Sequence, residues 1–312
     1  MSVKLKGGSA AATYLVDGNP KTVRKDVSLT DPNGYKHLRD QYAWMKYHSV
    51  EHPLFFPRIF EDSYDGNVYS YSMEFIEGKS GNEYFREQPE YVSEFLSDAI
   101  ERIADHGFVD DFGPFQRYID RCKQHIANLN SKPLFRKLQN ANHLRIAENN
   151  TVENIRNIDF FKFFQVLEEA APKMNKLTSN CHGDFTLENV IFGENGGMII
   201  DCNFLFSNWN SWLLDVSKVF QSIHFDYEET FAPTTRSEFD EKSNTLSIDY
   251  DGSKGDLFRV FVEDYIPEHQ ELAHILEVTH YIRMLPYKLK ISEEDFIKAY
   301  FRLCQCYTHL EY

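Results

Sequence analysis

Residues 181–189 read Cys-His-Gly-Asp-Phe-Thr-Leu-Glu-Asn, a short stretch that decides how the rest of the chain is interpreted. It places three polar residues, His182, Asp184 and Asn189, in a segment that is otherwise typical of buried chain. A carboxylate followed by an amide five residues later, and then by a second carboxylate at Asp201, supplies a proton acceptor and oxygen ligands for Mg²⁺. Phosphoryl transfer requires these groups, so the pattern indicates a phosphotransfer site.

The composition is that of a globular protein. A chain of 312 residues with 42% hydrophobic residues can fill a sizeable core and is long enough for two domains or one two-lobed domain. The 48 acidic against 33 basic residues give a net charge of −15, which argues against nucleic acid as a partner. No run approaches the roughly 20 apolar residues of a membrane span, and no secretory segment is evident. The five cysteines lack disulfide-framework spacing. We therefore expect a cytoplasmic protein, of unknown oligomeric state.

The N-terminal part predicts a small sheet with one helix. Residues 7–25 read as two strands joined by a turn, and apolar residues at helical spacing predict a helix over 34–48 that ends before Pro53. Further strand patterns lie within 56–60 and 67–76.

The remainder of the chain is mainly helical in pattern. The helical segments are about 91–107, 114–128, 158–177, 211–224 and 270–308. The stretch 190–206 is an exception, because it contains two short β-like runs around a Glu-Asn-Gly-Gly turn. Residues 226–256 read as a long acidic loop, and long loops inside compact domains are often functional.

The string His-Gly-Asp-x-x-x-x-Asn at 182–189, followed by Ile-Ile-Asp at 199–201, resembles the catalytic loop and metal-binding strand end of a known group of enzymes. These are the aminoglycoside phosphotransferases and choline kinases, small-molecule kinases with the protein-kinase-like fold. The resemblance covers most of the chain, because a sheet carrying Lys25 precedes a helical C-terminal half.

The resemblance implies an α+β, two-lobed protein-kinase-like fold. Residues 1–76 would form a small β-rich N-lobe with one helix, and a hinge would lie at about 73–77. Residues 77–312 would form a mainly α-helical C-lobe with the catalytic loop, the metal site and a pocket for the acceptor substrate. Its implied ligands are ATP, Mg²⁺ and a small-molecule hydroxyl acceptor.

The positions that match the family pattern imply roles for individual residues. Asp184 looks like the catalytic base that orients the substrate hydroxyl, and Asn189 and Asp201 look like the Mg²⁺ ligands. His182 is interpreted as a residue that holds the loop. Asp215 resembles the later aspartate that ties the catalytic loop to the following helix, which is a structural role.

Nucleotide contacts are implied in the N-terminal part. Lys25 stands where the family's third-strand lysine grips the nucleotide phosphates. Gly8 and Ser9 belong to what resembles a shortened glycine-rich loop. Glu74 and Ile76 lie in the hinge, where backbone groups would meet adenine.

One position departs from the family pattern. The family pairs its lysine with a glutamate of the next helix, yet no glutamate occurs between residues 26 and 50. Helical spacing places Gln41 at that position. An amide accepts a hydrogen bond from an ammonium group but forms no ion pair, so we expect Lys25 to be held less firmly. The alternative function is therefore a non-catalytic, pseudokinase-like nucleotide-binding module.

The resemblance allows three classes of acceptor substrate. An aminoglycoside, choline or ethanolamine, or a sugar would each fit the resemblance. Asp226 and Glu229 would suit an amine, although a solvated loop explains them equally well, and Arg283 could meet an anionic group.

A second catalytic pattern occurs at residues 48–52. His-Ser-Val-Glu-His matches the H-x-x-E-H string of zinc peptidases. Pro53 follows and biases the last histidine away from helical geometry, which disfavours zinc hydrolysis.

A third pattern lies near the C-terminus. Cys304-x-Cys306 with His309 could form a metal clip, but no partner pair of ligands is evident in the sequence. We interpret these cysteines as core thiols of a C-terminal helix.

Overall fold

The chain divides into two compact units. The structure, a computed structural model, describes residues 2–5, 11–105, 113–140, 143–148, 151–204, 209–249 and 268–310. The first unit comprises Met1–Asp110 and Asn180–Phe206, and the second comprises Asp111–Ser179 and Ser207–Tyr312. The lobe boundary expected near residue 77 stays a prediction.

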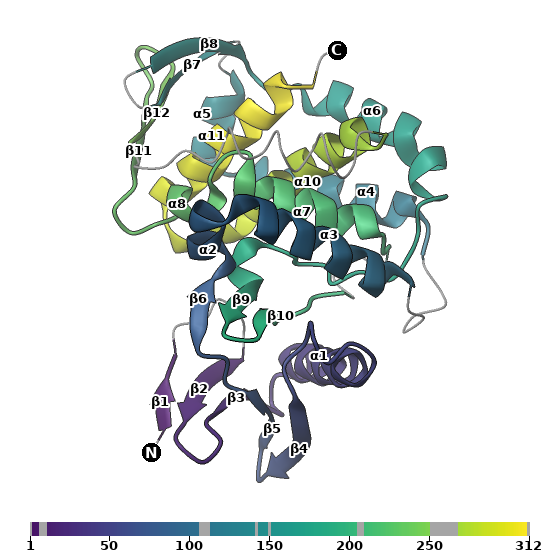
Figure 1. The fold of residues 1–312 in the computed structure, drawn as a ribbon. Coiled ribbons are helices and arrows are strands. Elements are labelled where there is room, and N and C mark those ends of the chain that lie inside the picture. The colour runs from purple at the N-terminus through teal and green to yellow at the C-terminus, as the bar shows by residue number, and fades with distance from the viewer. Residues whose placement is uncertain are drawn as a thin grey trace. The chain divides into compact units, whose positions relative to one another are not determined.

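A five-stranded antiparallel sheet opens the first unit, with the strand order β1-β2-β3-β5-β4 (Figure 1). The strands are β1 (Ser2–Lys4), β2 (Ala12–Val16), β3 (Thr22–Ser28), β4 (Ile59–Asp65) and β5 (Val68–Glu74). Helix α1 (Pro32–Glu51) connects β3 to β4 and packs against both. The predicted hairpin and the predicted helix are confirmed.

Local chemistry defines the ends of α1. The Asp31 side chain accepts a hydrogen bond from the Gly34 backbone N–H at 3.0 Å, and Pro32 occupies the first turn, where its missing N–H costs nothing. His52 leaves helical geometry immediately before Pro53, as the sequence predicts.

The first unit also contains a second, three-stranded sheet of order β10-β9-β6. Its elements and the accompanying helices are β6 (Gly78–Ser80), α2 (Gly81–Glu87), α3 (Pro89–Asp105), the 3₁₀ helix η1 (Leu187–Asn189), β9 (Val190–Gly193) and β10 (Gly196–Ile199). Gly193 pairs with Gly196 across the tight turn, and the positive φ of Gly196, 103°, is one that glycine adopts without strain. The hairpin predicted within 190–206 is confirmed.

The second unit is mainly helical. Its helices are α4 (Phe115–Leu129), α5 (Pro133–Asn140), α6 (Phe160–Met174), α7 (Trp212–Ile223), α8 (Tyr227–Thr230), α10 (Gln270–Ile291) and α11 (Glu293–Thr308). The helical pattern over 270–308 is interrupted at Ser292, whose extended backbone ends α10 and whose side chain caps α11 by accepting from the Asp295 N–H at 3.0 Å.

The expected acidic loop at 226–256 is wrong for its described part. Residues 226–249 contain α8 and two strands, β11 (Arg236–Asp240) and β12 (Thr245–Asp249). These strands join β7 (His143–Glu148) and β8 (Thr151–Arg156) in a four-stranded sheet of order β11-β12-β7-β8. The side chains of Asp226 and Glu229 are buried, at 3% and 8% exposed, so solvation in a loop does not explain them.

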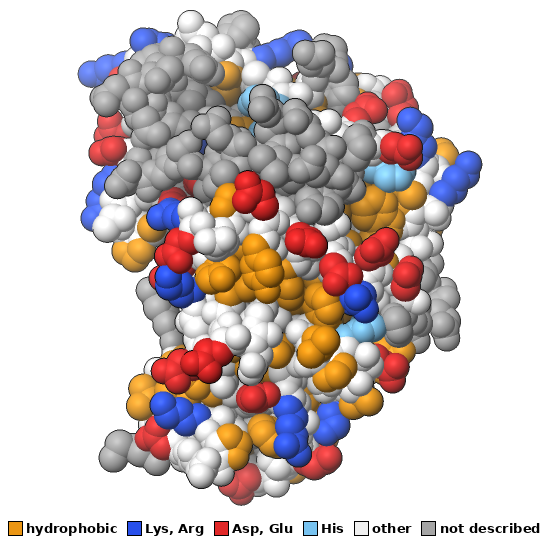
Figure 2. Space-filling view, viewed as in Figure 1, with side chains coloured by type: hydrophobic (Ala, Val, Ile, Leu, Met, Phe, Trp, Pro, Cys, Tyr) orange, Lys and Arg blue, Asp and Glu red, His pale blue; other side chains and the backbone are white. Residues whose placement is uncertain are grey.

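The predicted α+β class with a protein-kinase-like fold is confirmed by an antiparallel N-terminal sheet followed by a helical C-terminal part. In the face that Figure 2 shows, acidic and basic side chains are interspersed. Among the described residues, no helix is long and apolar enough to span a bilayer. None of the five cysteines forms a disulfide and all five are buried, as expected of core thiols.

Candidate active site

Lys25 is the buried cation of the first unit's large sheet. It lies on β3, between β2 and β5, where Val23, Lys25 and Val27 alternate onto the buried face of the strand. Its side chain is only 2% exposed. An ammonium group buried to this extent requires charged or hydrogen-bonding partners.

Two side chains are the partners of the buried Lys25 ammonium group. The Lys25 ammonium forms an ion pair with Asp201 and donates a hydrogen bond to Gln41 Oε1 at 3.2 Å. The Tyr71 hydroxyl donates to the same oxygen at 2.9 Å, and Gln41 Nε2 donates to the Cys202 carbonyl at 2.8 Å. Because an ammonium group only donates and a carbonyl only accepts, these partners define the orientation of the Gln41 amide.

This geometry explains why an amide suits position 41. A glutamate could accept from Lys25 and Tyr71, but it could not donate to the Cys202 carbonyl and would bring a carboxylate against that oxygen. The ion pair that a glutamate adds would not offset this, because Lys25 already pairs with Asp201.

Gln41→Glu should therefore lower the free energy of unfolding by about 1–3 kcal/mol, measured by chemical denaturation at neutral pH. Gln124→Glu on α4 is the matched control, because it makes the same charge change at an exposed site. Unfolding of Gln41→Glu at or above the wild-type denaturant midpoint would contradict this account of the network.

Asp201 has an unusual backbone conformation. It follows β10 with φ at 61°, in the left-handed region that few residues other than glycine adopt. Such conformations cost free energy and occur at functional sites where the surrounding structure enforces them. The Asp201 side chain is 36% exposed, so the carboxylate is accessible despite its pairing with Lys25.

Asp184 and Asn189 are joined through the loop of residues 182–189. Asn189 Nδ2 donates to the Asp184 carbonyl at 2.7 Å and to its carboxylate Oδ2 at 3.3 Å. With Nδ2 used in this way, the carbonyl Oδ1 on the other side of the amide is available to ligate a cation. The Ile200 N–H donates to the Asn189 carbonyl at 2.9 Å, which connects the loop to the residue preceding Asp201.

His182 holds the loop as a neutral imidazole. Its Nδ1 accepts from the Asp184 N–H at 3.3 Å, and its Nε2 donates to the Ile200 carbonyl at 2.8 Å. Burial lowers the pKa of His182 to about 4, despite the opposing charge of Asp184. These contacts fit the loop-holding role predicted for it.

Gly183 occupies a position that only glycine fits. Its φ is 81°, and a Cβ atom there would lie 2.4 Å from the Asn203 carbonyl oxygen. The close approach arises because the Asn203 N–H donates to the His182 carbonyl at 2.7 Å. The loop of residues 182–189 thus depends on this glycine to pass beside residue 203.

The predicted hinge has free backbone groups. The N–H groups of Glu74 and Phe75 donate to neighbouring carbonyls, whereas the Ile76 backbone forms no hydrogen bond within the described part of the chain. A cavity of about 280 Å³ adjoins this segment. Its lining residues are Glu74, Phe75, Ile76, Glu77, Gly193, Glu194, Asn195, Gly196 and Met198. The adenine contacts of the hinge stay a prediction, and Gly8 and Ser9 lie outside the described residues.

Four predicted residues belong to the second unit. Asp215 is buried on α7. Asp226 begins α8 with φ at 49°, and Glu229 lies within that helix. The Arg283 guanidinium stacks over the Tyr118 ring and donates to its hydroxyl at 3.1 Å. Their roles in the site stay predictions.

The H-x-x-E-H string does not form a metal cluster. His48 is fully buried, with its ring 4.0 Å from that of Trp44, whereas Glu51 is exposed. Among the described residues, the one grouping of three metal-ligating side chains lies elsewhere.

Sequence reasoning missed two side chains at the site. Tyr71 lies opposite Lys25 in the β3–β5 pairing and donates to Gln41. His37 lies one helical turn before Gln41, and burial followed by the charge of Lys25 lowers its pKa. The four-residue spacing of His37 and Gln41 could have indicated a shared face.

The solved structures with similar folds include small-molecule kinases. An aminoglycoside phosphotransferase in ternary complex with AMP-PNP and hygromycin B matches 99% of this chain and 94% of its own, with a TM-score of 0.59 and 11% identity. A choline/ethanolamine kinase family protein from Mesorhizobium loti matches 100% and 88%, with a TM-score of 0.57 and 14% identity. An aminoglycoside phosphotransferase from Streptomyces rimosus matches 91% and 92%, with a TM-score of 0.54 and 13% identity.

At these identities the likeness shows the fold alone. A search of curated proteins finds no match to the sequence. The model of the phosphotransferase enzyme family known as APH, however, matches residues 3–236, which is most of the chain. With the kinase-like fold and the paired loop and strand-end residues, this match establishes that the chain belongs to the phosphotransferase enzyme family.

Proposed function

We propose that the protein is an ATP-dependent kinase that transfers the γ-phosphoryl group to a hydroxyl of a small molecule. One observation carries the proposal: a single hydrogen-bonded network joins the loop bearing Asp184 and Asn189 to the strand end bearing Asp201, and Asp201 pairs with Lys25. A proton acceptor, oxygen ligands and a buried cation are thus held in one network, which is the set that phosphoryl transfer uses.

In the proposed reaction, Asp184 orients the acceptor hydroxyl and takes its proton. The acceptor oxygen forms a bond to the γ-phosphorus as the bond from that phosphorus to the bridging oxygen of ADP breaks. Lys25 supplies positive charge beside the phosphates. Gln41 and Tyr71 hold Lys25 through the shared amide oxygen, so little reorganisation is needed when the nucleotide binds.

The oxygen donors present suit magnesium. Asn189 and Asp201 would hold the ion, because carboxylate and amide oxygens are ligands that Mg²⁺ accepts and because Asn189 Nδ2 already donates to Asp184. When bound, Mg²⁺ would neutralise charge on the phosphate oxygens.

Two similar solved structures support the proposed classes of acceptor substrate. One neighbour was solved with AMP-PNP and hygromycin B, and another belongs to the choline/ethanolamine kinase family. We propose an aminoglycoside, an amino alcohol such as choline or ethanolamine, or a sugar as the acceptor. Asp226 and Glu229 would favour an amine, and Arg283 an anionic group.

A screen of acceptors tests the proposal. Purified protein with Mg·ATP should release ADP only when an aminoglycoside, amino-alcohol or sugar acceptor is present, as measured by a coupled assay. Each responding compound is then repeated with Asp184→Asn protein to exclude a contaminating kinase.

Two other outcomes of this screen would contradict the proposal. If no acceptor stimulates ADP release while Mg·ATP still raises the melting temperature, the non-catalytic nucleotide-binding module replaces this proposal. If Mg·ATP neither turns over nor shifts the melting temperature, nucleotide use itself is contradicted.

A further inference from the structure

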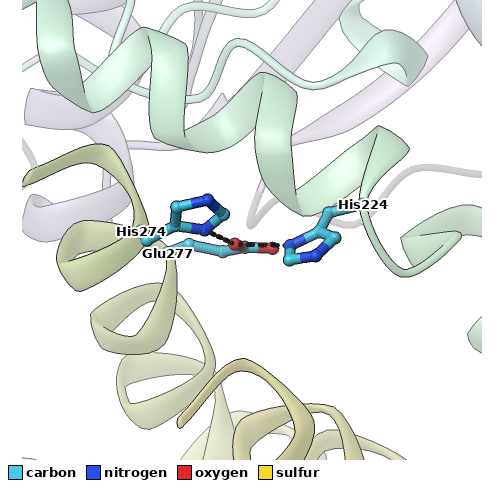
Figure 3. Close-up of side chains that lie close together, drawn as sticks. All are labelled: His224, His274 and Glu277. Carbon is cyan, nitrogen blue, oxygen red and sulfur yellow. Dashed lines mark hydrogen bonds and ion pairs between the residues drawn. The ribbon is translucent and has the colours of Figure 1, made fainter. Parts of the chain in front are cut away.

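Three metal-ligating side chains of the second unit converge at a place that has no role in the proposed reaction. Figure 3 shows the rings of His224 and His274 directed at one carboxylate oxygen of Glu277. The candidate ligand atoms of the three residues all lie within 4.8 Å of one another. They are the one grouping of this kind among the residues that the structure describes.

The spacing of these atoms matches a zinc coordination shell. His224 Nδ1 lies 3.0 Å from Glu277 Oε2, and His274 Nδ1 lies 3.3 Å from the same oxygen. A tetrahedral zinc ion with nitrogen and oxygen ligands at about 2.0–2.1 Å places neighbouring ligand atoms roughly 3.3 Å apart. Small side-chain rotations would therefore let an ion replace the two imidazole protons.

The elements that carry the ligands also favour a cation. His274 and Glu277 are three residues apart on α10 and so share one helical face. His224 is the C-terminal cap of α7, where the helix dipole places partial negative charge. The ring of His309, the cap that ends α11, lies 5.2 Å from the ring of His224.

The Glu277 carboxylate provides a second, independent observation. Glu277 is fully buried, and within the described structure its Oε1 has no hydrogen-bond partner that meets ordinary geometry. A buried carboxylate with an unsatisfied oxygen is costly unless a cation shares the site.

Two residues of the C-terminal pattern border this group. Cys306 interacts with the Glu277 carboxylate, and the ring of His309 lies 5.2 Å from that of His224. Cys304, the third residue of the pattern, lies elsewhere, with its sulfur 4.0 Å from Asn157 Oδ1.

We propose that His224, His274 and Glu277 bind a divalent transition-metal ion, zinc foremost, which links the end of α7 to α10. Two imidazoles and one carboxylate form a donor set that zinc commonly takes. Both histidines keep a small exposed fraction, 11% and 15%, through which an ion can enter, whereas Glu277 has none.

Cobalt(II) is the probe for this site. Full-length protein stripped with chelator is titrated with Co²⁺ in excess Mg²⁺, so that the oxygen ligands Asn189 and Asp201 are occupied by the harder ion. We expect one equivalent of Co²⁺ with the intense visible bands of tetrahedral coordination, displacement by one equivalent of Zn²⁺, and a higher melting temperature with Zn²⁺. Absence of saturable binding or of these bands in the wild-type protein would overturn the proposal.

Two isosteric variants sharpen the assignment. Glu277→Gln removes the anionic ligand at nearly constant volume and should weaken Co²⁺ binding by about 100-fold or more. Glu51→Gln is the matched control, because it changes the exposed glutamate of the H-x-x-E-H string and should bind like wild type. Unchanged binding by Glu277→Gln, with folding verified by circular dichroism, would also overturn the proposal.

Discussion

Asp184→Asn should lower phosphoryl transfer to the responding acceptor by roughly 10²–10⁴-fold, the usual contribution of a general base. The substitution keeps the size of the side chain but removes its negative charge and its ability to take a proton. Asn189 Nδ2 reaches the Asp184 backbone carbonyl at 2.7 Å, so the loop keeps its main contact in the variant. The measurement is the rate of acceptor phosphorylation at saturating Mg·ATP.

Nucleotide binding separates this effect from misfolding. The Kd for Mg·ATP should stay within a few fold of wild type in Asp184→Asn, because Lys25 and Asp201 are unchanged. Asp120→Asn, at an exposed position of α4, controls for the loss of one negative charge and should retain full activity. Undiminished acceptor phosphorylation by Asp184→Asn would remove the carboxylate from the mechanism.

Gly183→Ala should lower the free energy of unfolding by about 2–5 kcal/mol. About 1–2 kcal/mol arises because an L residue is disfavoured at φ 81°, and the remainder from the overlap of Cβ with the Asn203 carbonyl, at 2.4 Å. The strain also displaces Asp184, so phosphorylation should fall with stability. Chemical denaturation and the transfer assay measure the two effects.

Gly66→Ala isolates the conformational part of this cost. Gly66 also has a positive φ, 59°, but a Cβ there would meet no atom within 4 Å. Its substitution should cost about 1 kcal/mol and leave transfer unchanged. If both variants lose the same stability, the close approach at residue 203 has no part in shaping the loop of residues 182–189.

Local patterns predicted the parts of the fold that local chemistry controls. Alternation placed Val23 and Lys25 on one strand face, and helical spacing placed Gln41 on the inner side of α1. The break at Ser292 was missed, although a serine followed by acidic residues is an N-terminal cap signal. Apolar residues at helical spacing on both sides of Ser292 made 270–308 read as one helical segment.

Contacts between distant segments could not be read from the sequence. The Gln41 amide donates to the Cys202 carbonyl 161 residues later. The sequence alone therefore did not show why an amide is favoured over a carboxylate at position 41. Strands β11 and β12 form a local antiparallel hairpin that the acidic composition of the segment concealed. The parallel pairing of β12 with β7, which joins Leu246 to Ile146, could not be read from the sequence. His224 and Glu277 lie 53 residues apart and meet only when α7 and α10 pack together.

The central claim is that the γ-phosphoryl group moves from ATP to a small-molecule hydroxyl. Phosphorus NMR of the wild-type protein with Mg·ATP and the acceptor found in the screen tests it most directly. The account predicts that the γ-phosphate resonance of ATP decays while a phosphomonoester resonance of the acceptor grows in equal amount. Decay of ATP into ADP and inorganic phosphate alone, or no change with any acceptor, would contradict it.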